Sequence, residues 1–232
     1  MDSYYISDSC FLKNKKLYFE NESNKIKINK KNWFKYLGEY GWEKLPIDWR
    51  RKLDFKEFGI LDCGANGDCL FHVISEGFNL YKIFNNSCDP ELNLYDISDI
   101  RKIAANGINE ENYIPIIENY KCDDDFLGLW NPEIVNSREE LKNEIIKEGD
   151  NFWGDHITLQ LIQEYLHFNV IIMNNDVDIQ HLACDLNKYD KTMIIYYIDN
   201  CHFQLIGHFD GNIIKTLFTK DEIPECLISL CK

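Results

Sequence analysis

Apolar residues recur at helical spacing in several segments of the chain. Just after residue 69, Phe71, Ile74 and Phe78 follow the i, i+3, i+7 pattern of a single helix face. Ser137 opens a Ser-Arg-Glu-Glu sequence, which has the spacing of a helix-capping box. The pattern predicts four helices. One begins at residue 70, one runs from the N-cap Ser98 to Ile103, one covers residues 138–146, and one covers residues 157–166.

The pattern changes to strands after residue 169. Residues 170–173 and 193–197 are continuous apolar runs rich in β-branched side chains, as expected of buried strands. Shorter apolar runs at 203–206 and 213–214 flank Asp210-Gly211, which is a turn sequence of β-hairpins. Because helices come first and strands later, the fold class is predicted to be α+β.

The first 45 residues differ in character from the rest of the chain. Trp33, Trp42 and three other aromatic residues between them make residues 33–42 too apolar for a free linker, so this part is expected to pack on the body. The basic stretch at residues 25–31 could contact RNA or a membrane, but the favoured interpretation is a solvated N-terminal arm. We therefore divide the chain into an N-terminal basic and aromatic arm, residues 1–45, and a body, residues 46–232.

Composition narrows the class of protein. With 232 residues and 45% hydrophobic side chains, the chain can bury the core of one large domain. It has no apolar run of about 18 residues and no secretory leader pattern at its start, so no membrane association is expected. Nine cysteines without C-x-x-C spacing predict reduced thiols, a cytoplasmic location, and neither a disulfide framework nor a metal site. Cys122 and Cys184 are expected to be buried or half-buried hydrophobes.

The net charge of −14 is distributed unevenly. Residues 1–56 carry 13 Lys and Arg against 8 Asp and Glu, whereas the remainder carries 12 against 31. An acidic body argues against nucleic acid as the main partner, because phosphate binding needs clustered cations. It suits a basic protein partner, or serves solubility alone.

The sequence Asn66-Gly67-Asp68-Cys69-Leu70 joins a turn to the start of a helix. A cysteine at a helix N-terminus lies near unpaired backbone N–H groups, which favour the thiolate. The same N–H groups can stabilise an oxyanion. A nucleophile needs both conditions and a packing cysteine needs neither, so Cys69 is the candidate nucleophile.

A cysteine nucleophile needs a base, and six histidines are candidates. His202 lies between two predicted strands, where an imidazole can point across a cleft at a helix N-terminus. His208 has a similar claim, but six residues along an extended strand separate the two by about 20 Å. Both cannot serve one thiolate, and the strand pattern favours His202.

Three motifs resemble the ovarian-tumour (OTU) family of cysteine proteases. The run from Asn66 to His72 resembles the family's Asp-Gly-x-Cys signature, Trp153-Gly154-Asp155 resembles its Trp-Gly element, and His202-Phe203 resembles its terminal His motif. Their order and separation agree over about residues 55–220. The abundance of Asn, Ile and Lys is similar to that of OTU proteins of large DNA viruses with AT-rich genomes.

The resemblance implies a papain-like fold, with a small mixed or antiparallel sheet packed between helices. It also implies hydrolysis of bonds at the C-terminus of ubiquitin, with Cys69 as nucleophile and His202 as base. Trp153 and Asp155 would then contact substrate. Ubiquitin, polyubiquitin or a ubiquitin-like modifier is the expected partner of a monomer that needs no cofactor and no metal, and binds neither nucleic acid nor membrane.

Two positions depart from the family pattern. Asn66 stands where the family usually has Asp, and Gln204 stands two residues after the histidine, where Asp or Asn is common. The Asn66 amide can donate to an oxyanion, and a neutral amide can complete a Cys-His-Asn arrangement. Neither supplies negative charge to an imidazolium. An inactive or weak ubiquitin binder and another papain-fold amide hydrolase are therefore alternatives.

Overall fold

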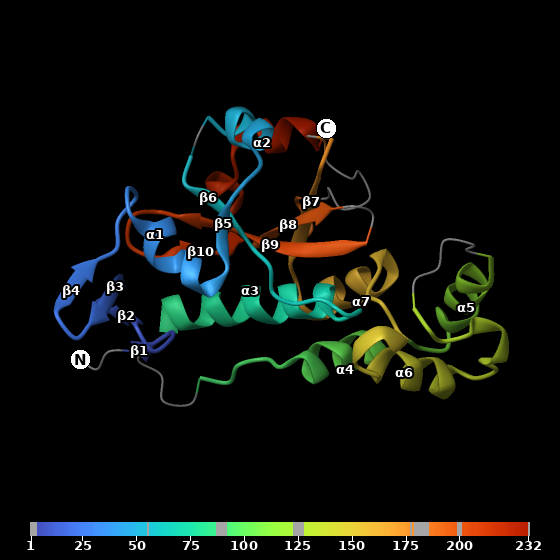
Figure 1. Cartoon of the computed structure of the whole chain (residues 1–232). Helices are drawn as coiled ribbons and strands as arrows, with labels where there is room; N and C mark the ends of the chain where they lie inside the picture. The colour runs from blue at the N-terminus through green and yellow to red at the C-terminus, as the bar shows by residue number, and fades with distance from the viewer. Residues whose placement is uncertain are drawn as a thin grey trace.

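The computed structural model describes residues 4–54, 56–86, 92–122, 128–176, 178, 186–198 and 201–231. A mixed β-sheet lies between helices, so the predicted α+β class is confirmed (Figure 1). A second, smaller sheet is built by the N-terminal arm and lies to one side of the first.

The central sheet has seven strands in the order β11-β8-β9-β6-β5, with β7 paired to β8 and β10 paired to β9. Among the strand pairs of the described residues, the β7–β8 pair alone is parallel. The strands are β5 (Trp42–Lys44), β6 (Phe58–Leu61), β7 (Asn169–Asn174), β8 (Thr192–Ile198), β9 (His202–Phe209), β10 (Ile214–Lys215) and β11 (Leu217–Phe218). The strands predicted from residues 170, 193, 203 and 213 onward are therefore confirmed.

Helices cover both faces of this sheet. Successive side chains of β9 point to opposite faces, and apolar side chains lie on each of them. Phe203 and Leu205 belong to the larger buried cluster, on the face covered by α3 (Cys69–Asn86). Ile206 belongs to a second cluster with Trp49 of α2 (Ile47–Lys52) and Leu227 of α8 (Glu225–Leu230). Both faces are therefore apolar, and β9 lies at the centre of the fold.

Four more of the described helices lie near the N-terminal end of α3, and the first of them contacts it directly (Figure 1). They are α4 (Ile97–Gly107), α5 (Tyr113–Cys122), α6 (Arg138–Ile146) and α7 (His156–Leu166). Ser137 caps α6 as predicted, since its hydroxyl accepts a hydrogen bond from the backbone N–H of Glu140 at 3.2 Å. The cap of α4 was predicted at Ser98 and is Asp96 instead, which forms a reciprocal capping box with Asp99. Short 3₁₀ turns lie at Gly38–Tyr40, Pro132–Ile134, Gly149–Asn151 and Lys220–Glu222.

The N-terminal arm forms a four-stranded antiparallel sheet that the sequence pattern did not predict. Its strands are β1 (Tyr4–Tyr5), β2 (Cys10–Lys13), β3 (Lys16–Asn21) and β4 (Asn24–Lys27). The turn between β2 and β3 consists of Asn14 and Lys15, both with left-handed backbone at φ 51° and 55°. This turn geometry matches the twist of a hairpin. The turn sequence, however, lacks the glycine from which such a turn is usually predicted.

The arm continues into the body through α1 (Trp33–Leu37) and β5. Trp33 is fully buried, stacks on Phe209 of β9 at 5.5 Å, and donates its indole N–H to Glu57 at 2.9 Å. Strand β5 then adds to the central sheet beside β6. The end of the arm is thus part of the body's core, and the division at residue 45 stays a prediction.

The described cysteines are all free thiols. Cys122 is exposed at the end of α5, so its predicted burial is wrong: the apolar residues of α5 that face inward are Ile117 and Tyr120. Cys184 lies outside the described residues. None of the described helices is both long and apolar enough to span a bilayer.

Candidate active site

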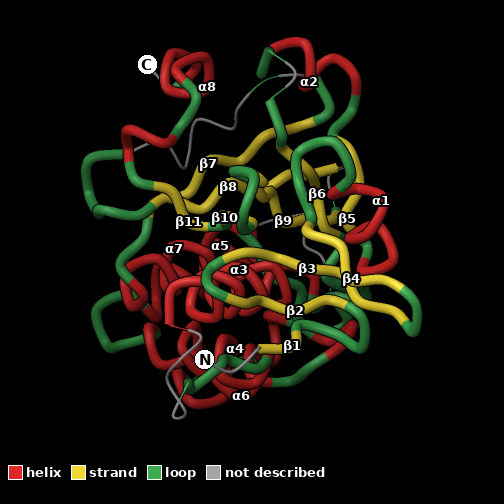
Figure 2. The backbone as a smooth tube through the Cα atoms, turned by 90° about the vertical axis from the view of Figure 1, so that its left-hand side faces the viewer, coloured by secondary structure: helices red, strands yellow, loops and turns green. Residues whose placement is uncertain are grey.

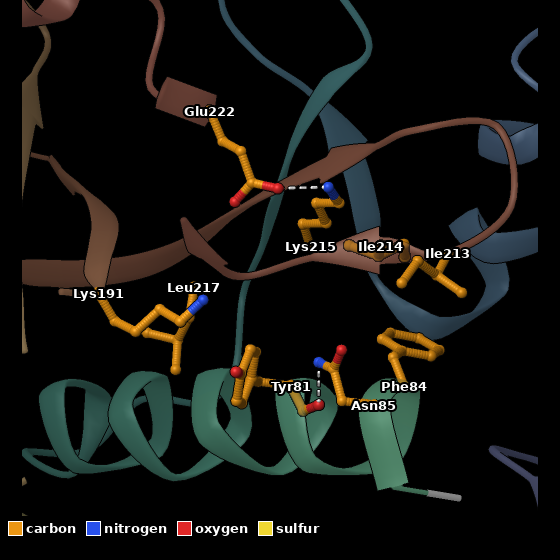
Figure 3. Close-up of a pocket in the computed structure, with 9 residues that line it drawn as sticks. All are labelled: Tyr81, Phe84, Asn85, Lys191, Ile213, Ile214, Lys215, Leu217 and Glu222. Atoms are coloured by element: carbon orange, nitrogen blue, oxygen red, sulfur yellow. Dashed lines mark hydrogen bonds and ion pairs between the residues drawn. The ribbon is translucent and has the colours of Figure 1, made fainter. Parts of the chain in front are cut away.

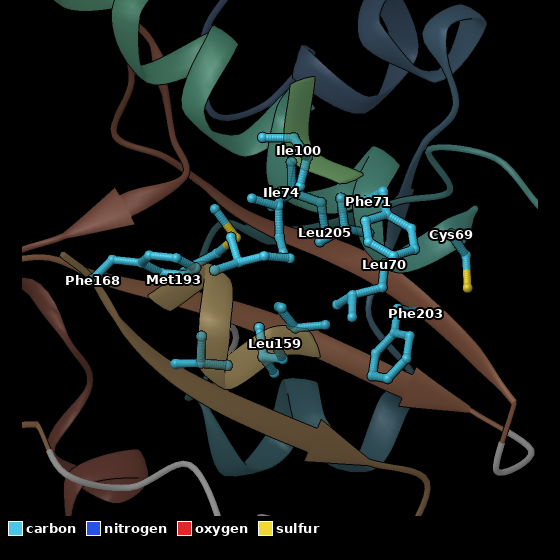
Figure 4. Close-up of a cluster of buried hydrophobic side chains, with 14 of the residues drawn as sticks. Cys69, Leu70, Phe71, Ile74, Ile100, Leu159, Phe168, Met193, Phe203 and Leu205 are labelled. Carbon is cyan, nitrogen blue, oxygen red and sulfur yellow. The ribbon is translucent and has the colours of Figure 1, made fainter. Parts of the chain in front are cut away.

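Cys69 is the first residue of α3 and lies at the edge of the main core (Figure 4). The helix begins there because the carbonyl of Asp68 accepts the first helical hydrogen bond, from the N–H of His72 at 2.9 Å. The side chain is only 5% exposed. Its Sγ lies 4.0 Å from the carbonyl oxygen of Cys201, the residue directly before His202. The thiol therefore lies beside the peptide bond that leads to His202.

The pKa of the Cys69 thiol is raised above its usual value. Burial is the main cause, because it disfavours the charged thiolate. The backbone N–H of Phe203 in β9 and those of Leu70 and Cys69 at the helix N-terminus act in the opposite direction, but they do not outweigh burial. The N–H groups of the helix N-terminus thus favour the thiolate as expected, but burial determines the net direction. A nearby base is required to take the proton.

The loop before Cys69 turns through two left-handed residues, Asn66 at φ 60° and Gly67 at φ 83°. Only glycine fits at position 67, since a Cβ there would lie 2.4 Å from the carbonyl oxygen of Gly149 and 2.8 Å from Trp153 Cδ1. Trp153 therefore packs directly against the cysteine loop. Asn66 is exposed.

His202 is the first residue of β9 and its ring faces a carboxylate. Its Nε2 lies 3.2 Å from Asp62 Oδ1, and the same oxygen accepts a hydrogen bond from the backbone N–H of Gly64 at 3.1 Å. Asp62 comes directly after β6, which pairs with β9 in the sheet. With Nε2 directed at Asp62, Nδ1 remains for a proton exchange with a thiol.

No hydrogen bond joins the Cys69 thiol to the His202 imidazole within the described part of the chain. Nucleophile–base hydrogen bonds are often long before substrate binds. The site thus consists of the Cys69 thiol, which contacts the carbonyl of Cys201, and the imidazole of the next residue, His202. The Asp62 carboxylate contacts that imidazole.

His208, the competing histidine, has a different environment at the other end of β9. Its ring packs on Phe58 with 4.6 Å between centroids, and burial together with Lys30 and other lysines lowers its pKa to about 4. An imidazole with that pKa is neutral near pH 7 and is a poor acceptor for a thiol proton. This contrast favours His202 as the base. His181 lies outside the described residues.

The remaining predicted site residues take other positions. Gln204 lies two residues along β9 from His202, opposite Tyr196 of β8, and is half-buried. The Asp155 carboxylate caps α7 by accepting the backbone N–H of Thr158 at 2.8 Å, so its local role is structural.

Asp68, directly before the nucleophile, forms a buried ion pair that the sequence did not reveal. Its Oδ1 accepts from Arg101 Nε at 2.8 Å, and its Oδ2 accepts from the backbone N–H of Gly149 at 2.7 Å. Arg101 is fully buried and also donates to the carbonyl oxygens of Ile145 and Phe152, at 2.7 and 2.9 Å. This pair links the cysteine loop to α4, to the end of α6 and to residues 149–152.

Arg101→Met is expected to lower the free energy of unfolding by about 3–5 kcal/mol, because Asp68 would then remain as an uncompensated buried charge. Urea denaturation measures the change. Arg138→Met is the matched control: Arg138 forms only exposed ion pairs, so its loss should cost about 0–1 kcal/mol. Equal losses in the free energy of unfolding for the two substitutions would contradict the proposed contribution of the buried pair to stability.

Two site residues, Asp62 and Arg101, were missed at the sequence level. The one local signal for Asp62 is its place directly after an apolar run, seven residues before Cys69. Arg101 gives no such signal, since it is one of several charged residues in a helix. No cluster of three or more metal-ligating side chains occurs among the residues described.

A small cavity of about 110 Å³ lies away from this site (Figure 3). It is lined by Tyr81, Phe84 and Asn85 from the last turns of α3, and by Lys215, which pairs with Glu222. Cys69 begins the same helix at its other end. The cavity is therefore separate from the candidate active site.

Comparison with solved structures gives OTU domains. The chain is similar to an OTU domain in complex with ubiquitin, with 16% identity, a TM-score of 0.48, and coverage of 75% of this chain and 85% of that chain. For a ubiquitin-bound OTU deubiquitinase from Wolbachia pipientis wMel the identity is 10% and the TM-score 0.45, with coverage of 67% of this chain and 99% of that chain. For the Hazara virus OTU bound to ubiquitin the identity is 12% and the TM-score 0.38, with coverage of 90% of this chain and 96% of that chain.

Neither the scan against protein-family models nor the search of curated proteins gave a match. The structural TM-scores lie below 0.5 and the identities below 25%. The catalytic roles are therefore inferred from the side chains of the site and their geometry.

Proposed function

We propose that this chain is a cysteine-type deubiquitinase that hydrolyses peptide or isopeptide bonds at the C-terminus of ubiquitin. The observation that carries the chemistry is the pairing of His202 with Asp62, one residue from the carbonyl that contacts the Cys69 thiol. The ubiquitin specificity rests on the resemblance of the Cys69, Trp153 and His202 motifs to the OTU family. We further propose that it acts as a cytoplasmic monomer.

The proposed reaction begins when the imidazole of His202 takes the Cys69 proton. The thiolate attacks the carbonyl carbon of the terminal glycine of ubiquitin, and donors near Asn66–Cys69 stabilise the oxyanion. The imidazolium then donates its proton to the departing lysine amine, which leaves a thioester. Finally the neutral imidazole activates water, which hydrolyses the thioester and restores the thiol.

Asp62 has the role of orienting and stabilising the imidazolium. It holds Nε2 at 3.2 Å and is itself held by the Gly64 N–H. Because it is a carboxylate, it supplies the negative charge that neither Asn66 nor Gln204 can supply. The departure from the family pattern at those two positions is thereby compensated.

A second candidate function is ubiquitin binding without cleavage. The raised pKa of the Cys69 thiol favours it, since a buried neutral thiol is a weak nucleophile. A ubiquitin probe that carries an electrophile at its C-terminus distinguishes the two functions. Covalent labelling of Cys69 supports the deubiquitinase, whereas tight binding without labelling supports the binder. If neither occurs, the ubiquitin proposal is wrong and another amide substrate must be sought.

Asp62→Asn is expected to lower kcat about 10- to 100-fold and to leave KM nearly unchanged. The loss should be smaller than the ~10⁴-fold loss of a buried triad aspartate, because the Asp62 side chain is 56% exposed. Steady-state cleavage of ubiquitin with a fluorescent leaving group measures both constants. Asp48→Asn, at an exposed aspartate of α2, is the control. An unchanged kcat in Asp62→Asn would remove Asp62 from the mechanism.

Asn66→Gly tests whether the Asn66 amide donates to the oxyanion. Glycine keeps the left-handed backbone at φ 60° and removes only the side chain. We expect kcat to fall roughly 10²- to 10³-fold with little change in KM. Asn66→Ala should add a loss of stability, because the left-handed region costs an L-residue about 1–2 kcal/mol. A near-normal kcat in Asn66→Gly would assign Asn66 to the turn alone.

A further inference from the structure

The small N-terminal sheet presents two chemically different faces. The strand register directs Cys10, Leu12 and Leu17 to one side, where they join the main core. The residues between them point the opposite way. That outer side carries Lys13, Lys16, Lys25 and Lys27, together with Tyr5 and Tyr18. We call this set, with Phe11 and Glu20, the lysine–aromatic face; Figure 2 looks at the end of the molecule that carries it.

Three aromatic rings form a row across this face. Phe11 lies directly opposite Tyr5 on one side and Tyr18 on the other, with ring centroids 5.3 and 5.5 Å away. Phe11 is fully buried although it belongs to neither core cluster, because its neighbours on this face cover it. Tyr5 is 58% exposed. Phe11 and Tyr18 therefore support the row from within, and Tyr5 is the ring that is available for stacking.

The charges around the row are mostly positive. The ammonium of Lys25 lies 4.3 Å above the Phe11 ring, and Lys27 lies opposite Tyr18. Lys13 and Lys16 face each other directly across the β2–β3 pair and are both exposed. Like charges at directly opposed positions are unfavourable in a sheet. Glu20 is the one acidic side chain of the set.

We propose that the lysine–aromatic face binds single-stranded nucleic acid. Lysines that contact phosphates and aromatic rings on which bases stack are the two elements of such sites. A duplex would use the lysines but not the rings, since its bases are already stacked. An acidic protein segment would likewise leave the rings without a planar partner. The combination on one face therefore favours an unpaired strand.

The sheet lies away from the candidate active site and differs from the body in charge. The N-terminal sheet lies near the C-terminal end of α3, whereas Cys69 begins that helix roughly 27 Å from its other end (Figure 1). Charges separated by more than about 8 Å are largely screened at physiological salt. The expectation against nucleic acid rests on the charge of residues 57–232, whereas residues 1–56, which include this sheet, carry 13 Lys and Arg against 8 Asp and Glu.

Fluorescence anisotropy of the full chain with labelled 12-nucleotide oligouridylate and oligothymidylate tests the proposal and distinguishes RNA from DNA. We expect binding that weakens as salt rises from 50 to 200 mM. Lys13→Glu/Lys16→Glu should reduce the slope of log K against log salt by about 1.4, since each phosphate contact on a single strand contributes about 0.7. Tyr5→Leu keeps an apolar cover over Phe11 but removes the stacking ring, and should weaken binding about tenfold.

Lys102→Glu/Lys121→Glu is the matched control, because it makes the same charge change at exposed positions of α4 and α5. An equal loss in this control, or no binding of either oligonucleotide at 50 mM salt, would overturn the proposal. So would a 12-residue polyglutamate that binds the face more tightly than both oligonucleotides. Reaction with the ubiquitin probe is read separately at Cys69, so either proposal can fail without the other.

Discussion

Cys69→Ala is expected to abolish cleavage of ubiquitin conjugates, with a loss of about 10⁶-fold in kcat or more. The thiol is the only group in the proposed reaction that forms a bond to the substrate, and loss of a nucleophile has an effect of this size in other proteases. Stability should change little, because Ala is the best helix former and the hydrogen bond from the thiol to the Cys201 carbonyl is long, at 4.0 Å. Cleavage kinetics and a melting curve together measure the two effects.

The neighbouring cysteines provide the controls for this result. Cys201 is exposed and Cys63 is half-buried, and burial raises the pKa of Cys63 far above its usual value. Cys201→Ala and Cys63→Ala should each retain cleavage and probe labelling. If Cys69→Ala still cleaves while one of these two does not, the nucleophile has been assigned to the wrong cysteine.

His202→Ala is expected to lower kcat by roughly 10⁴- to 10⁶-fold, because the base serves both the acylation and the hydrolysis step. His208→Ala should stay within about tenfold. Its imidazole packs on Phe58 and has a pKa of about 4, so it neither faces Asp62 nor exchanges a proton near pH 7.

The two histidine variants are compared at equal folded fraction, as measured by thermal melting. His208→Ala leaves a gap beside Phe58 and should lower the melting temperature more than His202→Ala, since His202 lies at the start of β9 and its ring pairs with a carboxylate that is 56% exposed. A large loss of kcat in folded His208→Ala, with His202→Ala nearly unaffected, would exchange the roles of the two residues.

Much of the central fold could be predicted because its elements have strong local patterns. The strands of the C-terminal half are buried on both faces and therefore read as continuous apolar runs. The N-terminal sheet has no such pattern. Its outer face carries lysines, and its first turn, Asn14-Lys15, adopts left-handed backbone without a glycine. Its order comes from the packing of Leu12 and Leu17 on the main core, which is a tertiary effect.

The candidate site divides in the same way. Cys69 and His202 belong to local motifs, so the sequence indicated them. Asp62 reaches His202 only because β6 pairs with β9, a contact across 140 positions of the chain. The partner of Asp68 lies 33 residues away in α4, and no spacing rule connects them. The pKa of Cys69 depends on how deeply the core buries it, which a linear pattern cannot express.

The Asp68–Arg101 pair has a consequence for the order in which the protein folds. A lone charge is costly in an apolar interior, so neither residue can be buried until the other arrives. Arg101 also needs the carbonyl groups of Ile145 and Phe152. The chain must therefore have been synthesised beyond residue 152 before the loop that presents Cys69 can reach its final shape. We expect the nucleophile to mature late and cooperatively, so that partly folded or truncated chains carry an unreactive thiol.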